Sequence, residues 1–244
     1  MQDGPQAAVL DYELARVAAL DLTGAQAGQV VSPLTGGAAV VSLVRPTFDA
    51  AFLDDQIGKV LDALDAGPHR DNTVVLFTSD NGYHLGEKDF FFKDTLWEES
   101  DRIPLIVSGP GFAAGTTCDQ PVSHIDRYPT LVDLCGLPPQ PHAATHGLPL
   151  DGSSLRPLLE RPEEGTWEGP PAALTSVRGR SGTHHSIRTR THRYILCGNA
   201  EEELYDHIRD PYEWHNLADD PRSAELKEEL RSLLLKLIHQ EPKP

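Results

Sequence analysis

The sequence is poor in basic residues and cysteine, and it has no long apolar run. Lys and Arg total 21 of 244 residues against 37 Asp and Glu, giving a formal charge of −16. Proteins that bind nucleic acid use a basic face to displace counterions, so this balance argues against nucleic acid as a partner. A small anion is not excluded, because a few lysines can dominate the potential inside a cleft. No apolar stretch approaches membrane-spanning length, so no membrane span is predicted.

The three cysteines, Cys118, Cys135 and Cys197, are odd in number and lack C-x-x-C spacing. They indicate neither a zinc site nor a disulfide framework, and we expect buried thiols. The N-terminus, MQDGPQAAVLDYELARVAAL, carries acidic residues where a signal peptide has basic ones, so no export signal is predicted. The compartment stays open.

The first half of the chain alternates helix and strand patterns after a poorly specified segment, 1–45. RPTFDAAFLDDQIGKVLDALDAG predicts an amphipathic helix that begins near Pro46 and stops at Gly67 and Pro68. TVVLFTS and IPLIVSG have the composition of buried parallel strands. A helix is expected from about Asp126 to Leu134. Residues 46–140 are therefore predicted to form an α/β unit with a parallel sheet and flanking helices.

The second half changes character. Residues 141–171 are rich in Pro, Gly and Glu and predict a surface linker with a short helix at SSLRPLLE. From 172 to 244, short alternating segments are followed by SAELKEELRSLLLKLIHQ, with leucines at helical spacing. This pattern predicts a C-terminal α+β subdomain, in which a small antiparallel sheet packs on a terminal helix.

Chelating side chains follow the strand TVVLFTS directly. In open parallel sheets, ligands bind beyond the carboxyl ends of strands. Asp80 and Asn81 offer one charged and one neutral oxygen ligand, which suit Ca²⁺ or Mg²⁺ better than zinc. Taken alone, Asp-Asn-Gly is first of all a turn sequence.

Three further polar residues of the same stretch are site candidates. Lys88 and Lys93 could bind sulfate or phosphate oxygens as point charges, and His84 could donate a proton or a hydrogen bond to a leaving group. Each has an ordinary alternative, since lone surface lysines are usually solvated and a lone loop histidine is more often structural.

Taken in order, S-D-N-G-Y-H-L-G-E-K, then Lys93, then R-I-P-L-I-V-S-G-P-G, this region closely resembles the sulfatase family of the alkaline-phosphatase superfamily. FDAAFLDDQIGKVLDAL, HIDRYPTLVDLCGLP and ELYDHIRDPYEWHNLADDP extend the resemblance over about residues 46–240, closest to the iduronate-2-sulfatase-like branch. The resemblance implies a partial alkaline-phosphatase-like fold and hydrolysis of sulfuric esters of a carbohydrate or an aryl alcohol. Relatives are commonly exported.

Residue by residue, the resemblance implies that Asp80 and Asn81 bind the catalytic cation, normally Ca²⁺, with Mg²⁺ as the alternative. It implies that Lys93 contacts the sulfate being transferred. His84 and Lys88 lie in the same motif, and we carry His84 as a catalytic candidate and Lys88 as a substrate-binding candidate.

The chain departs from the family in one respect. Sulfatases of this kind use formylglycine made from a C-x-P-S-R or S-x-P-x-R motif, and neither motif occurs here. The sequence therefore predicts a sulfatase without its nucleophile-bearing N-terminal half, inactive alone, whose exposed strand edge at 73–79 invites a partner chain. The alternatives are a phosphodiesterase or phosphonate hydrolase of the same superfamily, or a catalytically dead domain that binds glycans or a partner.

Overall fold

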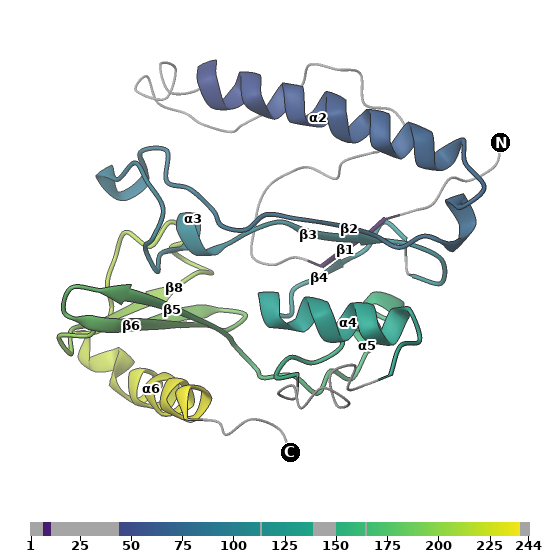
Figure 1. Ribbon diagram of the computed structural model, residues 1–244. Coiled ribbons are helices and arrows are strands. Elements are labelled where there is room, and N and C mark those ends of the chain that lie inside the picture. Colours follow the sequence, from purple (N-terminus) through teal and green to yellow (C-terminus); the bar gives the residue numbers. More distant parts are fainter. Residues whose placement is uncertain (1–6, 11–43, 113, 139–149, 164, 240–244) are drawn as a thin grey trace.

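The computed structural model describes residues 7–10, 44–112, 114–138, 150–163 and 165–239. Figure 1 shows two sheets with helices packed around them. Helix α2 (Val44–Asp65) lies on one side of the first sheet, and α4 (Arg127–Leu134) and α5 (Arg156–Glu160) lie on the other. Most of the segment 1–45 and part of the predicted linker lie outside the described residues, and the predicted domain boundaries stay predictions.

The first sheet has the strand order β2-β3-β1-β4. Its strands are β2 (Val75–Thr78), β3 (Leu105–Ser108), β1 (Ala7–Leu10) and β4 (Thr117–Cys118). Strand β2 stands at the edge of this sheet, with β3 as its neighbour. The two predicted strands of this unit are therefore present, and the α/β class is confirmed.

The prediction of a parallel sheet is wrong for these strands. Strand β2 pairs antiparallel with β3, so that Thr78 lies opposite Leu105, and β3 is also antiparallel to β1; only β1 and β4 are parallel. The reason lies in the connection, residues 79–104. It contains only the short helix α3 (Glu98–Asp101) and a single 3₁₀ turn, so no crossover helix returns the chain to the other end of the sheet.

The helices predicted from the sequence are present. Helix α2 ends before Gly67, and α4 ends before Gly136, which has the positive φ of 62° that favours glycine at a helix stop. Helix α2 leaves much of its apolar face uncovered, since Phe52 is 63% and Val60 68% exposed. No described helix is long and apolar enough to cross a membrane.

The core of the first unit lies between its sheet and α5. It is made of buried apolar side chains from the sheet, from α5 and from the segments next to them: Leu105, Val107, Cys118, Val122, Leu155, Leu158 and Leu159. Cys118 is thus a buried thiol as predicted, whereas Cys135 is exposed and Cys197 half-buried, and none of the three is in a disulfide.

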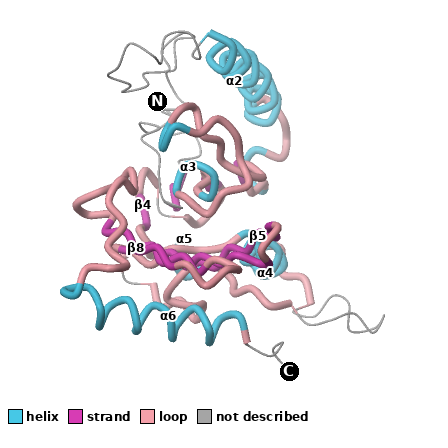
Figure 2. The backbone as a smooth tube through the Cα atoms, turned by 90° about the vertical axis from the view of Figure 1, so that its left-hand side faces the viewer, coloured by secondary structure: helices cyan, strands magenta, loops and turns pink. Residues whose placement is uncertain are grey.

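The second sheet is an antiparallel meander, as predicted. It runs β5 (Ala173–Gly179), β6 (Gly182–Arg188), β7 (His192–Leu196) and β8 (Glu202–Asp206). Helix α6 (Ala224–Ile238) covers one face (Figure 2), where Leu230 and Leu234 pack on Ile187, Tyr194 and Leu204. The opposite face meets the connection after β2 through a smaller cluster, Leu96, Ile195 and Tyr205.

Candidate functional site

A cavity of about 810 Å³ opens beyond the end of β2. Its walls come mainly from the connection after β2, the start of α4 and strand β5, with further residues from positions 151, 153, 168–170 and 237. The lining includes Asp80, Asn81, Asp94, Thr95, Ser100, Asp101, Ser123, His124, Asp126, Asp151, Ser153, Glu168, Thr175 and Ser176. The position agrees with the expectation that a site follows the strand TVVLFTS.

Asp80 and Asn81 stand side by side on this wall, with Asp80 exposed. The backbone N–H of Asn81 donates to Asp80 Oδ1 at 3.0 Å, and the hydroxyl of Ser79 donates to the carbonyl of Asn81 at 2.8 Å. Lys93 is not itself among the residues that line the cavity, but its Nζ donates to Asn81 Oδ1 at 2.8 Å. Three of the five predicted site residues are therefore brought together.

Gly82 allows this loop to lie against α3. Its N–H donates to the carbonyl of Ser100 at 2.9 Å, and a Cβ at this position would stand 2.2 Å from the carbonyl oxygen of Glu99. Because real Cβ atoms do not approach oxygen so closely, a side chain here would push the loop off the helix. The turn after Asp80 and Asn81 is thus fixed by contact with α3.

His84 does not line the cavity. Its side chain is fully buried, its Nε2 lies 2.8 Å from Thr95 Oγ1, and its ring packs edge-on to Phe90 and Trp97. Burial is the main cause that lowers the pKa of His84, against the opposing charge of Glu87. The ring is therefore neutral near pH 7.

Lys88 points toward the C-terminal subdomain. Its ammonium donates to the carbonyl of Glu213, lies 3.4 Å from Tyr205 Oη, and stands over the rings of Trp97 and Tyr205 at 4.7 and 4.6 Å. Lys88 and Glu213 both have positive φ, 54° and 58°. This contact holds two strained loops together, and Lys88 is not among the residues that line the cavity.

Thr95, His124 and Asp126 also line the cavity, although no sequence motif pointed to them. Burial and Arg127 lower the pKa of His124, while the charge of Asp80 raises it. Asp126 is buried and accepts the N–H groups of Ser123 and Ser153 at 2.7 and 2.8 Å. Single residues of this kind have no motif, and only the fold brings them to Asp80.

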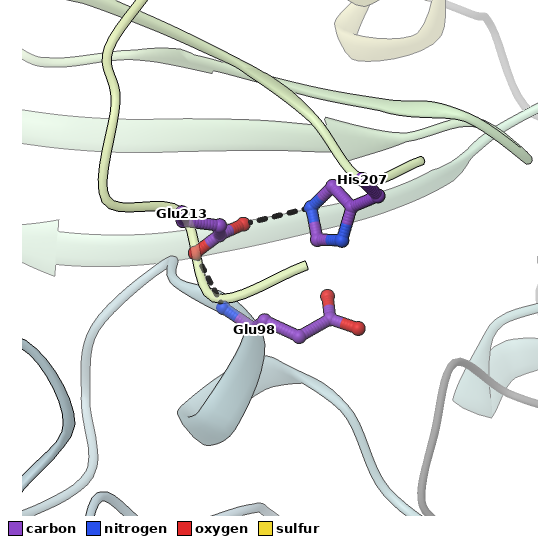
Figure 3. A group of neighbouring side chains, drawn as sticks. All are labelled: Glu98, His207 and Glu213. Atoms are coloured by element: carbon purple, nitrogen blue, oxygen red, sulfur yellow. Dashed lines mark hydrogen bonds and ion pairs between the residues drawn. The ribbon is translucent and has the colours of Figure 1, made fainter. Parts of the chain in front are cut away.

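Glu98, His207 and Glu213 form a second polar group, with ligand-type atoms within 4.8 Å of one another (Figure 3). Such a group could hold a metal ion, but a guanidinium already lies among its carboxylates. Arg193 bonds Glu98 at 2.5 Å, Asp101 at 2.6 Å and Glu213 at 2.7 Å. We therefore describe the group as a buried ion-pair network that joins α3 to the second sheet.

The pKa values of this network differ between its two glutamates. Burial raises the pKa of Glu213, but Arg193 and the hydrogen bond from His207 outweigh it and lower the pKa to about 2. Burial raises the pKa of Glu98 even though Arg193 lies beside it. The surroundings therefore favour the ionised form of Glu213 more strongly than that of Glu98.

Known proteins resemble this chain over about three quarters of its length. Residues 49–137 match the family model described as Sulfatase. This part of the chain therefore resembles the sulfatase family. A "Sulfatase" of Formosa agariphila is 36% identical over 188 residues, which is 76% of this chain and 34% of that protein. The chain spans about a third of the length of the curated relatives it matches.

Solved structures extend the sulfatase likeness to the fold. The structure of BT4656 in complex with its substrate D-glucosamine-2-N,6-O-disulfate aligns with a TM-score of 0.67 and 30% identity, over 75% of this chain and 37% of that chain. The phosphonate monoester hydrolase of Agrobacterium radiobacter aligns with a TM-score of 0.65 and 28% identity, over 76% of this chain and 38% of that one. Over the aligned three quarters of its length, this chain thus has a fold similar to that of both hydrolases.

Proposed function

We propose that this chain supplies the metal-binding and sulfate-binding wall of a sulfatase that hydrolyses sulfate esters of carbohydrates. The observation that carries the proposal is the hydrogen bond between Lys93 and Asn81 beside a large cavity. It sets a cation side by side with hard oxygen ligands, as a sulfate ester held on a divalent metal requires. The match of residues 49–137 to the Sulfatase model and the likeness to a protein that binds a sulfated glucosamine support the choice of substrate.

The donors of Asp80 and Asn81 fit a hard cation, with Ca²⁺ preferred and Mg²⁺ as the alternative. Both residues line the same cavity, and Asp80 is open to it. A bound cation would polarise the oxygens of the sulfate. Because Ca²⁺ takes about six to eight oxygens, two ligands from one loop should bind it weakly.

Lys93 is proposed to hold a sulfate oxygen with its ammonium. Lys88 and His84 are proposed to act from behind the cavity wall: Lys88 fixes the loop against Glu213, and His84 supports Thr95. We also propose that the chain is closest to the iduronate-2-sulfatase-like branch, and the order of its motifs supports this choice.

We also propose that residues 1–244 alone do not turn over sulfate esters, because no C-x-P-S-R or S-x-P-x-R motif occurs in them. Turnover of 4-nitrophenyl sulfate by the purified chain, lost in Asp80→Ala and Lys93→Ala, would overturn this. Ligand binding does not require the nucleophile, so it tests the remaining proposal directly.

The binding experiment is calorimetric titration of the chain, in Ca²⁺, with glucosamine 6-sulfate and with unsulfated glucosamine. We expect the sulfated sugar to bind more tightly and Lys93→Met to weaken it by about tenfold or more, since a hydrogen bond to a charged group contributes about 1.5–3 kcal/mol. Lys59→Met, on an exposed part of α2, is the matched control. Equal binding of the two sugars would refute a sulfate site.

A second candidate function is phosphonate ester hydrolysis, favoured by the structural likeness to the Agrobacterium enzyme. Phenylphosphonate and phenyl sulfate titrated in parallel separate the two. Tighter binding of the phosphonate would favour this candidate, and Ca²⁺-independent glycan binding would favour a dead binding domain.

A further inference from the structure

A buried histidine stands directly behind one hydroxyl of the cavity wall. His84 is 0% exposed, and its Nε2 lies 2.8 Å from Oγ1 of Thr95. Thr95 itself is half-buried and lines the cavity together with Asp80 and Asn81. A ligand in the cavity can therefore meet the Thr95 hydroxyl but not the His84 ring.

The ring of His84 is held in one orientation. Phe90 and Trp97 meet it edge-on, with ring centroids at 5.5 and 6.0 Å and interplanar angles of 88° and 84°. Its backbone N–H donates to the carbonyl of Phe92 at 2.9 Å. Since these two ring contacts hold the imidazole in place, the direction of its bond to Thr95 is fixed as well.

The neutral ring carries one N–H, and we assign it to Nε2. Nδ1 is buried and has no hydrogen-bond partner among the described residues. An orphaned N–H in the interior is rarer than an orphaned acceptor, so a lone pair rather than a proton belongs at Nδ1. The Nε2–H then donates to Thr95 Oγ1. That leaves the hydroxyl hydrogen of Thr95 available for a ligand.

The backbone places this hydroxyl next to the proposed sulfate contact. Asp94, with a φ of 70°, turns the chain between Lys93 and Thr95, and Lys93 reaches Asn81 from this turn. The N–H of Thr95 lies 3.3 Å from the hydroxyl of Ser100, which anchors the turn to α3. The carboxylates that line the rest of the cavity repel an anion, so donors near Lys93 mark where an anion can lie.

We propose that Thr95 donates its hydroxyl hydrogen to a sulfate oxygen of the bound ester, and that His84 is a positioning residue that acts through Thr95. The proposal rests on the function proposed above and adds a second donor beside Lys93. It gives His84 a role behind the cavity wall. No proton leaves His84 in this arrangement.

The test is titration of glucosamine 6-sulfate, with unsulfated glucosamine as the reference, into the full chain in Ca²⁺. Thr95→Val should weaken binding of the sulfated sugar about 10- to 100-fold, as loss of a hydrogen bond to a charged group does. Thr95→Ser keeps the hydroxyl and should stay within about twofold. His84→Leu should weaken binding as well, and His84→Gln, which retains a donor near the Nε2 position, should restore most of it.

A spectroscopic measurement on the wild-type chain covers the case in which Thr95→Val does not fold. Sodium sulfate, compared with sodium chloride at equal ionic strength, should shift the ¹⁵N signal of His84 Nε2 and leave the exposed ring of His215 unmoved. A purely structural His84–Thr95 pair would not respond. If sulfate causes no specific shift of the His84 signal, the proposal is overturned.

The outcomes separate this proposal from the function on which it rests. If Lys93→Met weakens binding of the sulfated sugar and Thr95→Val does not, the donor role of Thr95 is wrong, whereas the sulfate site is supported. If the wild-type chain does not distinguish the two sugars, both are wrong. Both proposals are supported if Thr95→Val and His84→Leu lose affinity for the sulfated sugar. Thr95→Ser and His84→Gln should then retain most of it.

Discussion

The ammonium of Lys93 lies 2.8 Å from the same Asn81 oxygen that is proposed to bind a divalent cation. A lysine and a cation that share one oxygen repel each other. Lys93→Met should therefore raise the affinity for Ca²⁺ by about threefold or more, since like charges a few ångströms apart interact by several kcal/mol at low effective dielectric. The same variant should weaken binding of the sulfated sugar.

Calorimetry with Ca²⁺ alone checks this prediction. Asp80→Ala should abolish the Ca²⁺ signal, and Asp62→Ala, on an exposed turn of α2, should not change it. Ca²⁺ affinity that falls in Lys93→Met would contradict the shared-oxygen arrangement.

Arg193 is expected to be the most sensitive residue for stability. Its guanidinium is 2% exposed and faces the carboxylates of Glu98, Asp101 and Glu213. Arg193→Met leaves these groups buried without that cation, and breaking a buried pair costs about 3–5 kcal/mol. Urea unfolding should show this loss. Arg190→Met, whose guanidinium is 61% exposed, is the control and should change the free energy of unfolding by less than about 0.5 kcal/mol.

Lys88 should contribute to stability and not to ligand binding. Its ammonium lies over Trp97 and Tyr205, and cation–π contacts of a desolvated ammonium contribute about 2 kcal/mol. Lys88→Met should lower the free energy of unfolding by about this amount. Affinity for glucosamine 6-sulfate should change by less than about twofold, because the ammonium of Lys88 is bound to the carbonyl of Glu213, whereas that of Lys93 is bound to Asn81 on the cavity wall. A tenfold loss of affinity at unchanged stability would instead place Lys88 in the substrate pocket.

The carboxyl of Glu99 is expected to make the stability of the fold depend on pH. Burial, followed by the charges of Glu87 and Glu98, raises its pKa from 4.5 to about 7. The folded state therefore binds a proton more tightly than the unfolded state, so the contribution of Glu99 is fully present below pH 4.5 and is lost as the pH rises to about 7. Glu99→Gln should raise the melting temperature at pH 8 more than at pH 5.

The control for this pH effect is Glu229→Gln, since Glu229 is an exposed residue of α6. Its melting temperature relative to wild type should not depend on pH in this range. A Glu99→Gln benefit that is equal at pH 5 and pH 8 would show that the Glu99 carboxyl is not responsible.

Local patterns predicted much of this structure. The leucine spacing of residues 224–238 gave helix α6, and the glycines after α2 and α4 gave the ends of those helices. The polar residues after TVVLFTS gave the place of Asp80 and Asn81 on the cavity wall. In each case the signal lies within a few consecutive residues.

Other features depended on contacts between distant segments. The direction of β3 follows from how residues 79–104 turn back, which the composition of the strand does not encode. Strand β1 pairs between β3 and β4 although its sequence has no distinctive pattern. The burial of His84 depends on Phe90 and Trp97, and the partners of Arg193 come from α3 and the loop after β8. None of these pairings has a local signature.

The ion pairs of Arg193 have a consequence for how the protein opens. They tie α3, which holds the Gly82 turn, to the middle of the second sheet. If α3 or the second sheet opened alone, the buried charges on the other would lose their partners. Both should therefore unfold as one cooperative unit. The amides of Gly82 and Tyr194 should then exchange hydrogen with the same free energy of opening. The cavity wall around Gly82 would thus have the same local stability as the second sheet.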